Sequence, residues 1–155
     1  MEEVNTVEKI TDNDSDAQQY IVVSIGNEQY GINIQYIDNI VVNQRITRVP
    51  KSQNYYKGVI NLRGEIIPVM SIRLKLGLED DEYTAKTRII IIKVDGATIG
   101  VIVDQVKEVV TLESDDIESV AKTVSVVASG YISGIGKKNE ELISLLDIVT
   151  LIEEG

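Results

Sequence analysis

The fold of this chain is decided by the stretch Gly58-Val-Ile-Asn-Leu-Arg-Gly-Glu-Ile-Ile-Pro-Val-Met-Ser-Ile-Arg73. Its two short runs rich in β-branched residues predict two strands, and Arg63-Gly64 between them predicts a two-residue turn, because glycine adopts positive φ without steric cost. Pro68 lacks a backbone donor, which favours a sheet edge or a bulge for the second strand. Ser71 stands at the N-cap of a short helix that Gly77 ends. The stretch therefore predicts a β-hairpin followed by a short helix.

Further strands are expected on both sides of this hairpin. Apolar segments bounded by turn residues predict strands at 20–25, 29–34, 37–42, 87–94, 98–103, 106–112, 130–136 and 142–146, with a sheet extension at 45–49. The acidic run 79–82 is expected to be a linker, and residues 113–119 a polar turn. Asp147 is expected to cap a last helix over 148–153. Residues 1–18 are acidic and show no period, so we expect a disordered tail there.

The two halves of the chain resemble each other. Gly31–Val41 aligns with Gly100–Val110, glycine over glycine and aliphatic over aliphatic, and Ile66–Ile72 aligns with Leu142–Ile148. After a small shift, Gly58, Ile60 and Gly64 align with Gly130, Ile132 and Gly136. Such a repeat predicts two similar lobes, at about 19–82 and 83–155. Because each half is too small to stabilise a core of its own comfortably, the lobes are expected to share one, and five short strands per lobe favour small barrels.

Composition excludes several classes of function. The 155 residues carry a net charge of −10, which disfavours general affinity for nucleic acid or anionic membranes. The chain has neither Cys nor His, so thiol and imidazole nucleophiles and the usual zinc ligands are absent. The sequence shows no apolar run of the length of a membrane helix and no secretion signal. We therefore expect a soluble, cytoplasmic protein without a cofactor.

Other chemistries find weaker support. Gly134-Ile-Gly136-Lys137-Lys138 is similar to part of a phosphate-binding loop, but the full spacing is missing and a strand follows instead of a helix. The acidic runs at 79–82 and 113–116 lack the alternating ligands and central glycine of a calcium loop, so solvated turns are the simpler interpretation. A catalytic carboxylate pair has no motif of its own. An enzyme of unknown chemistry on a small acidic β-barrel fold stays the alternative function.

Three motifs carry a family resemblance. Tyr30-Gly-Ile-Asn-Ile34, Lys57-Gly-Val-Ile-Asn-Leu-Arg-Gly-Glu-Ile-Ile-Pro-Val69 and Gly100-Val-Ile-Val-Asp104 together resemble the CheW family, the coupling (adaptor) proteins of bacterial and archaeal chemotaxis. The resemblance extends from about Tyr20 to Ile152. It implies a mainly β fold, one CheW-like domain over 19–155 with two similar five-stranded SH3-like β-barrel lobes, a shared apolar core and a short helix after each lobe. It also implies that the protein has no catalytic activity.

The resemblance further implies two partners. One is the regulatory domain of a CheA-type histidine kinase, and the other is the helical cytoplasmic tip of a methyl-accepting chemoreceptor. The protein would then be a non-enzymatic scaffold that couples receptor to kinase in chemotaxis signalling, recruited from the cytoplasm to membrane-associated receptor arrays. The residues tied by resemblance to receptor or kinase coupling are Ile37, Arg63, Val106 and Val109, which we assign to the receptor, and we expect the kinase to contact the sheet-edge residues Ile40, Val41 and Val42.

Two points about these residues stay open. Ile37, Val106 and Val109 suit an ordinary core as well as they suit an exposed groove. In the family, a glutamate two residues after the position of Ile37 often pairs with the arginine that matches Arg63. Here Asn39 stands at that position, which leaves Asp38 or Glu65 as substitutes.

Overall fold

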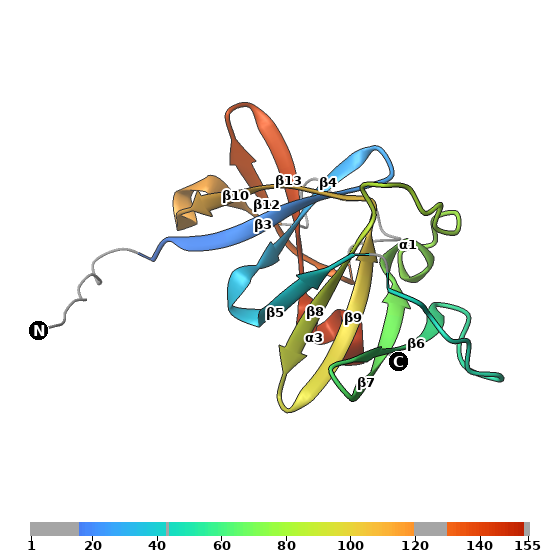
Figure 1. Ribbon diagram of the computed structural model, residues 1–155. Coiled ribbons are helices and arrows are strands. Elements are labelled where there is room, and N and C mark those ends of the chain that lie inside the picture. Colours follow the sequence, from blue (N-terminus) through green and yellow to red (C-terminus); the bar gives the residue numbers. More distant parts are fainter. Residues whose placement is uncertain (1–15, 43, 120–129, 154–155) are drawn as a thin grey trace, which may run out of the picture.

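The computed structural model describes residues 16–42, 44–119 and 130–153, which form two β-sheets (Figure 1). We call the sheet that holds the first and last strands the terminal sheet. Its strand order is β10-β3-β4-β13-β12-β11. The strands are β3 (Gln18–Ile25), β4 (Glu28–Asn33), β10 (Gln105–Leu112), β11 (Ile117–Glu118), β12 (Ile132–Lys138) and β13 (Glu141–Leu146).

The second sheet, which we call the central sheet, has the strand order β5-β8-β9-β7-β6. Its strands are β5 (Ile37–Val41), β6 (Tyr56–Leu62), β7 (Glu65–Ser71), β8 (Arg88–Val94) and β9 (Ala97–Val103). The helices are short: η1 (Ile34–Tyr36), α1 (Ile72–Lys75), η2 (Ser114–Asp116) and α3 (Ile148–Glu153). The architecture is mainly β with two lobes, as the sequence predicts.

The decisive hairpin is confirmed. Arg63 and Gly64 both have positive φ, 55° and 85°, and the Asn61 side chain accepts a hydrogen bond from the Gly64 amide at 3.0 Å. At the start of α1 the Ser71 hydroxyl accepts from the Leu74 amide, which is the predicted N-cap. Asp147 caps α3 in the same way through the Thr150 amide.

The prediction for Pro68 was wrong. β7 is not an edge strand, because it lies between β6 and β9. Its parallel pairing with β9 begins at Val69, one residue after Pro68, so the ladder on that side does not include the proline. The register irregularity of this hairpin lies in β6, between Tyr56 and Gly58, and not at Pro68.

The two halves of the repeat exchange their first hairpins. The hairpin β3–β4 lies between β10 and β13, and the hairpin β8–β9 lies in the same manner between β5 and β7. Four strand pairs therefore join the two halves: β3 with β10 and β5 with β8 are antiparallel, and β4 with β13 and β7 with β9 are the parallel pairs of the described sheets. The predicted lobe ranges, about 19–82 and 83–155, therefore each contribute strands to both sheets. Each sheet exists only when both halves of the chain are present.

The strand register corrects the predicted alignment of Gly58. Gly58 lies opposite Val69 and follows the irregularity in β6, whereas Gly134 lies opposite Leu145 and follows the same irregularity in β12. The turn Asn139–Glu140 matches Arg63–Gly64, with positive φ at both of its residues. The repeat-mate of Gly58 is therefore Gly134, four residues beyond the predicted Gly130.

Three other segments differ from the prediction. The predicted tail 1–18 ends too late, because Gln18 already begins β3, and residues 1–15 lie outside the described residues. Residues 45–49 do not continue a strand and contribute only the bridge from Thr47 to Val59. The polar turn after β10 contains η2 and the short strand β11. The glycines of the apparent phosphate loop lie inside β12, where a Cβ at Gly136 would meet Leu112 Cδ1 at 2.6 Å. Close packing accounts for that glycine without a phosphate.

The main core lies between the two sheets and is built from aliphatic side chains of both. Its fully buried members include Val23, Ile32, Ile90 and Val101. The helices α1 and α3 add Ile72, Ile148 and Leu151, and Leu76, directly after α1, packs with them. Two smaller clusters cover the outer faces of the sheets. Burying one such side chain contributes about 1.5–3 kcal/mol. Because its members come from both sheets, this is the shared apolar core that the repeat predicts, and we call it the shared core.

Candidate functional site

The predicted receptor residues Ile37 and Val106 occupy equivalent places on two edge strands. Ile37 begins β5 at the edge of the central sheet, and Val106 lies near the start of β10 at an edge of the terminal sheet. A register irregularity follows each of them directly. Both side chains are half-buried and pack against the shared core. Each side chain is therefore partly in the core and partly exposed to solvent, so both of the alternatives from the sequence, core position and exposed groove, apply in part.

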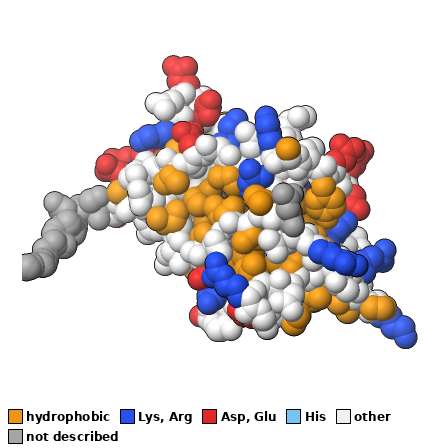
Figure 2. Space-filling model, viewed as in Figure 1, with side chains coloured by type: hydrophobic (Ala, Val, Ile, Leu, Met, Phe, Trp, Pro, Cys, Tyr) orange, Lys and Arg blue, Asp and Glu red, His pale blue; other side chains and the backbone are white. Residues whose placement is uncertain are grey.

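Apolar side chains gather on the face that carries these strands. Figure 2 shows them across the middle of the view, over the region of β3, β5 and β10 in Figure 1, with Lys and Arg side chains towards the margins. Val109 is 54% exposed, further along β10. A surface of this kind suits an apolar stripe on a partner helix.

The three predicted kinase residues do not share one face. Ile40 packs against the shared core, whereas Val41 packs against the smaller cluster on the opposite side of the central sheet. This alternation is what successive residues of a strand must show. Val42 follows the strand and is 42% exposed. The structure thus brings the edge of β5 to the surface, but of these three side chains only Val42 is largely exposed.

Arg63 stands apart from the other predicted residues, in the exposed turn between β6 and β7. Within the described part of the chain it has no ion pair. Asp38, one of the expected substitutes, lies 3.8 Å from Lys93 instead. The Asn39 side chain accepts a hydrogen bond from the Ile40 amide. The guanidinium is therefore available to a partner.

One group that the sequence analysis missed is an ion pair between Arg73 and Asp104. Arg73 Nε donates to Asp104 Oδ1 at 3.0 Å, and Arg73 Nη2 donates to Oδ2 at 2.7 Å. The Gly26 amide donates to the same Oδ2 at 2.8 Å. Asp104 lies where the chain passes from β9 in the central sheet to β10 in the terminal sheet. The pair therefore ties α1, this crossover and the β3–β4 turn together, and we call it the crossover clamp.

The environment of the crossover clamp favours its charged state. Burial opposes the charge of Asp104, but hydrogen bonds from Arg73 and Gly26 outweigh it, so the pKa of Asp104 is lowered. The hydrogen bond to Asp104 raises the pKa of Arg73. Both residues stand in or beside the motifs of the resemblance, but no spacing rule in a sequence pairs a helix residue with a crossover 31 residues away.

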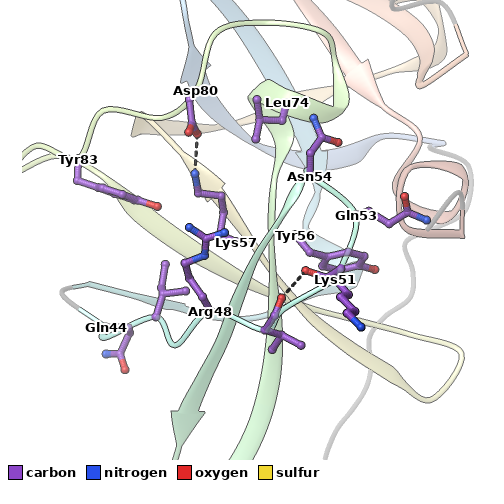
Figure 3. Close-up of a pocket in the computed structure, with 13 residues that line it drawn as sticks. Gln44, Arg48, Lys51, Gln53, Asn54, Tyr56, Lys57, Leu74, Asp80 and Tyr83 are labelled. Carbon is purple, nitrogen blue, oxygen red and sulfur yellow. Dashed lines mark hydrogen bonds and ion pairs between the residues drawn. The ribbon is translucent and has the colours of Figure 1, made fainter.

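A cavity of about 700 Å³ lies beside the loop between β5 and β6 (Figure 3). Most of its lining comes from that loop, and Tyr56, Lys57, Leu74, Asp80 and Tyr83 complete it. The Lys57 ammonium lies 2.6 Å from Asp80 Oδ1 at one side of the cavity. The acidic run 79–82 is thus not wholly a solvated linker, because Asp80 is paired and both carboxylate oxygens of Asp81 are buried.

The described residues contain no group of three or more Asp or Glu side chains that could hold a metal ion. In the same part of the chain, no helix is long and apolar enough to cross a membrane.

Comparisons with known proteins agree on one family. The family model described as "CheW-like domain" matches residues 19–155. The chain is 35% identical over 136 residues to the chemotaxis protein CheW of Helicobacter pylori, covering 88% of this chain and 82% of that protein. It is 34% identical over 137 residues to the chemotaxis protein CheW of Bacillus subtilis, with 88% of each covered. The crystal structure of the scaffolding protein TtCheW from Thermoanaerobacter tengcongensis superposes with a TM-score of 0.81 at 31% identity, covering 88% of this chain and 92% of that one.

Proposed function

Because this chain belongs to the CheW-like domain family, we propose that it is a non-enzymatic scaffold that couples chemoreceptors to a CheA-type histidine kinase in chemotaxis signalling. The observation that carries this proposal is the pair of equivalent edge strands, β5 and β10, each with an aliphatic side chain half-buried in the shared core. The alternative, an enzyme of unknown chemistry, gains no support from the described residues or from the comparisons. Binding to receptors would recruit the protein to membrane-associated arrays.

We assign the receptor to the face around Ile37 and Val106. A receptor tip is a helical hairpin, and an amphipathic helix binds through an apolar stripe. The exposed parts of Ile37, Val106 and Val109 supply matching apolar surface. Arg63, which has no ion pair among the described residues, would add a charged contact to either partner.

We assign the kinase to the outer edge of β5. An edge strand presents unpaired backbone groups that another chain can extend. Ile40, Val41 and Val42 lie along this edge, and Val42 is the exposed one. Ile40 and Val41 would act by holding the strand in place, since each packs on a different cluster.

The test is co-elution of the purified chain with the kinase regulatory domain and with a receptor-tip fragment on a sizing column. Val106→Asp is expected to abolish receptor binding and to leave kinase binding intact. Losing one buried aliphatic contact costs about 1.5–3 kcal/mol, which is about one to two decades in affinity. Since Val106 is half-buried, far-ultraviolet circular dichroism must first show that the variant folds; Val106→Thr is the milder variant if it does not. A folded Val106 variant that binds the receptor fragment normally would refute the assignment of this face.

A further inference from the structure

The loop between β5 and β6 is unusually long for a compact domain, since β5 ends at Val41 and β6 begins at Tyr56. Loops of this length without their own secondary structure are uncommon and usually have a function. Its middle is fixed to the central sheet, because Thr47 and Val59 exchange two backbone hydrogen bonds of 2.8 Å. The loop therefore holds the wall of the 700 Å³ cavity in a defined position.

The charge of this cavity is opposite to that of the chain. Arg48, Lys51 and Lys57 line it together with one acidic residue, Asp80, although the whole chain carries a net charge of −10. Lys57 is paired with Asp80. Arg48 and Lys51 have no ion pair within the described residues. Two cations are thus left for an anionic ligand in a protein that is acidic elsewhere.

Lys51, in the wall of the cavity, has a strained backbone conformation. Lys51 has φ of 67° and follows Pro50, the pattern of a type II turn, in which glycine or asparagine is the usual residue at this position. A side chain there costs on the order of 1–2 kcal/mol relative to glycine. The Ser52 hydroxyl closes the turn by donating to the Val49 carbonyl at 2.9 Å. Strain of this kind is found preferentially at binding sites.

The separation of Arg48 and Lys51 favours an anion with spaced charges over a single phosphate. Figure 3 shows Arg48 and Lys51 on different sides of the cavity, so they do not converge on one point as the ligands of a single phosphate would. The rest of the lining is mixed: Gln44 and Asn54 are polar, Leu74 and Tyr83 offer apolar surface, and Val49, which stands between the two cations in the sequence, is 44% exposed. Spaced carboxylates with an aliphatic side chain between them match this pattern.

We propose that this cavity binds an acidic peptide segment of a partner protein, with one carboxylate at Arg48, another at Lys51 and an aliphatic side chain against the apolar lining. The cavity begins where the β5 edge of the proposed function ends, because Gln44, which lines the cavity, donates to the Val42 carbonyl at 2.9 Å. It adds a docking point for an extended, acidic stretch of chain.

The test is fluorescence anisotropy of the full chain with a fluorescein-labelled octapeptide that contains four glutamates around a central leucine. Arg48→Gln and Lys51→Asn are each expected to raise the Kd about three- to fivefold, and together about tenfold or more. Added salt should raise the Kd of the wild-type protein, because the contacts are exposed. Lys51→Asn should at the same time keep or raise the Tm, since asparagine tolerates positive φ. Lys107→Gln, an exposed lysine on β10, is the matched control and should leave the Kd unchanged.

Three results would overturn the proposal. The first is an unchanged Kd in the Arg48→Gln, Lys51→Asn double variant. The second is equal binding of a peptide with glutamines in place of the glutamates. The third is displacement of the peptide by inorganic pyrophosphate at a lower concentration than by unlabelled peptide, which would mean a site for small anions. Co-elution with kinase and receptor fragments measures the proposed function separately, so the two proposals can fail independently.

Discussion

Removing the carboxylate of Asp104 should destabilise the whole molecule, because the crossover clamp ties parts of both sheets together. The carboxylate accepts hydrogen bonds from Arg73 Nε, Arg73 Nη2 and the Gly26 amide. The two side chains of the pair are 20% and 26% exposed. Hydrogen bonds to a charged group contribute about 1.5–3 kcal/mol in buried settings and less where solvent screens them. We therefore expect Asp104→Ala to cost about 2–3 kcal/mol, or about 5–10 °C in Tm for a chain of this size.

The measurement is urea unfolding of the wild type, Asp104→Ala, Asp104→Asn, Arg73→Met and the double variant of Asp104→Asn with Arg73→Met. Arg73→Met keeps the aliphatic stem of the side chain and removes the charge. A double-mutant cycle should give a coupling of about 1–2 kcal/mol. The matched control is Asp38→Asn, because Asp38 lies 3.8 Å from Lys93 with both side chains about half exposed, and it should change stability by less than about 0.5 kcal/mol.

The stability contribution of Asp104 has a defined pH dependence. Its pKa is lowered in the folded state, from an ordinary value of 3.8. The contribution is therefore complete above that ordinary value and is lost as the pH falls through the lower folded value. The gap in unfolding free energy between wild type and Asp104→Asn should be constant from pH 8 to pH 5 and should shrink below about pH 4. A coupling near zero, or a gap no larger than that of Asp38→Asn, would refute the structural role of the crossover clamp.

Three further predictions concern the turns and the tail. Gly58→Ala should cost more than about 3 kcal/mol, because its φ is 141° and a Cβ would lie 2.2 Å from the Thr47 carbonyl oxygen; Gly96→Ala, in an open turn, should lower the Tm much less, and equal losses would contradict the clash. Arg63→Ala should weaken receptor or kinase binding in the co-elution assay and leave the Tm within about 2 °C, since an exposed arginine without an ion pair holds little of the fold; a sharp fall in Tm with normal binding would show the opposite. Deleting residues 1–15 should leave the Tm and the kinase affinity nearly unchanged, whereas deleting 1–18 also removes Gln18, which pairs with Leu112, and should lower the Tm.

The sequence predicts the strands of this protein well because their signals are local. The runs of β-branched residues, the turn at Arg63-Gly64 and the caps at Ser71 and Asp147 each depend on a few neighbouring residues. The predicted boundaries of most strands and helices agree with the structure to within two residues. The sequence also shows the repeat, because corresponding strands of the two halves have the same pattern of glycine and aliphatic residues.

The partners of each strand could not be predicted in the same way. A repeat shows that two halves are similar, but it does not say whether a hairpin joins its own half or the other half. Pro68 shows the same limit: proline is tolerated in a central strand where no ladder needs its amide, and here Val59 opposite it bonds to Thr47 while the β9 ladder begins one residue later. The pairing of Arg73 with Asp104 depends on the exchange too, because the parallel pairing of β7 with β9 places the start of α1 beside the crossover from β9 to β10.

The exchange of hairpins also determines how the proposed receptor face is held. Ile37 is paired with Ile92 in β8, which belongs to the other half of the repeat, and Val106 is paired with Val23 in β3, again from the other half. The first half therefore supplies the edge strand β5 and also β3, which supports β10. The second half supplies the edge strand β10 and also β8, which supports β5. Neither Ile37 nor Val106 can keep its position if either half unfolds. The two strands that we propose as binding strands, β5 and β10, are thus parts of one cooperative structure, and this follows from the strand order.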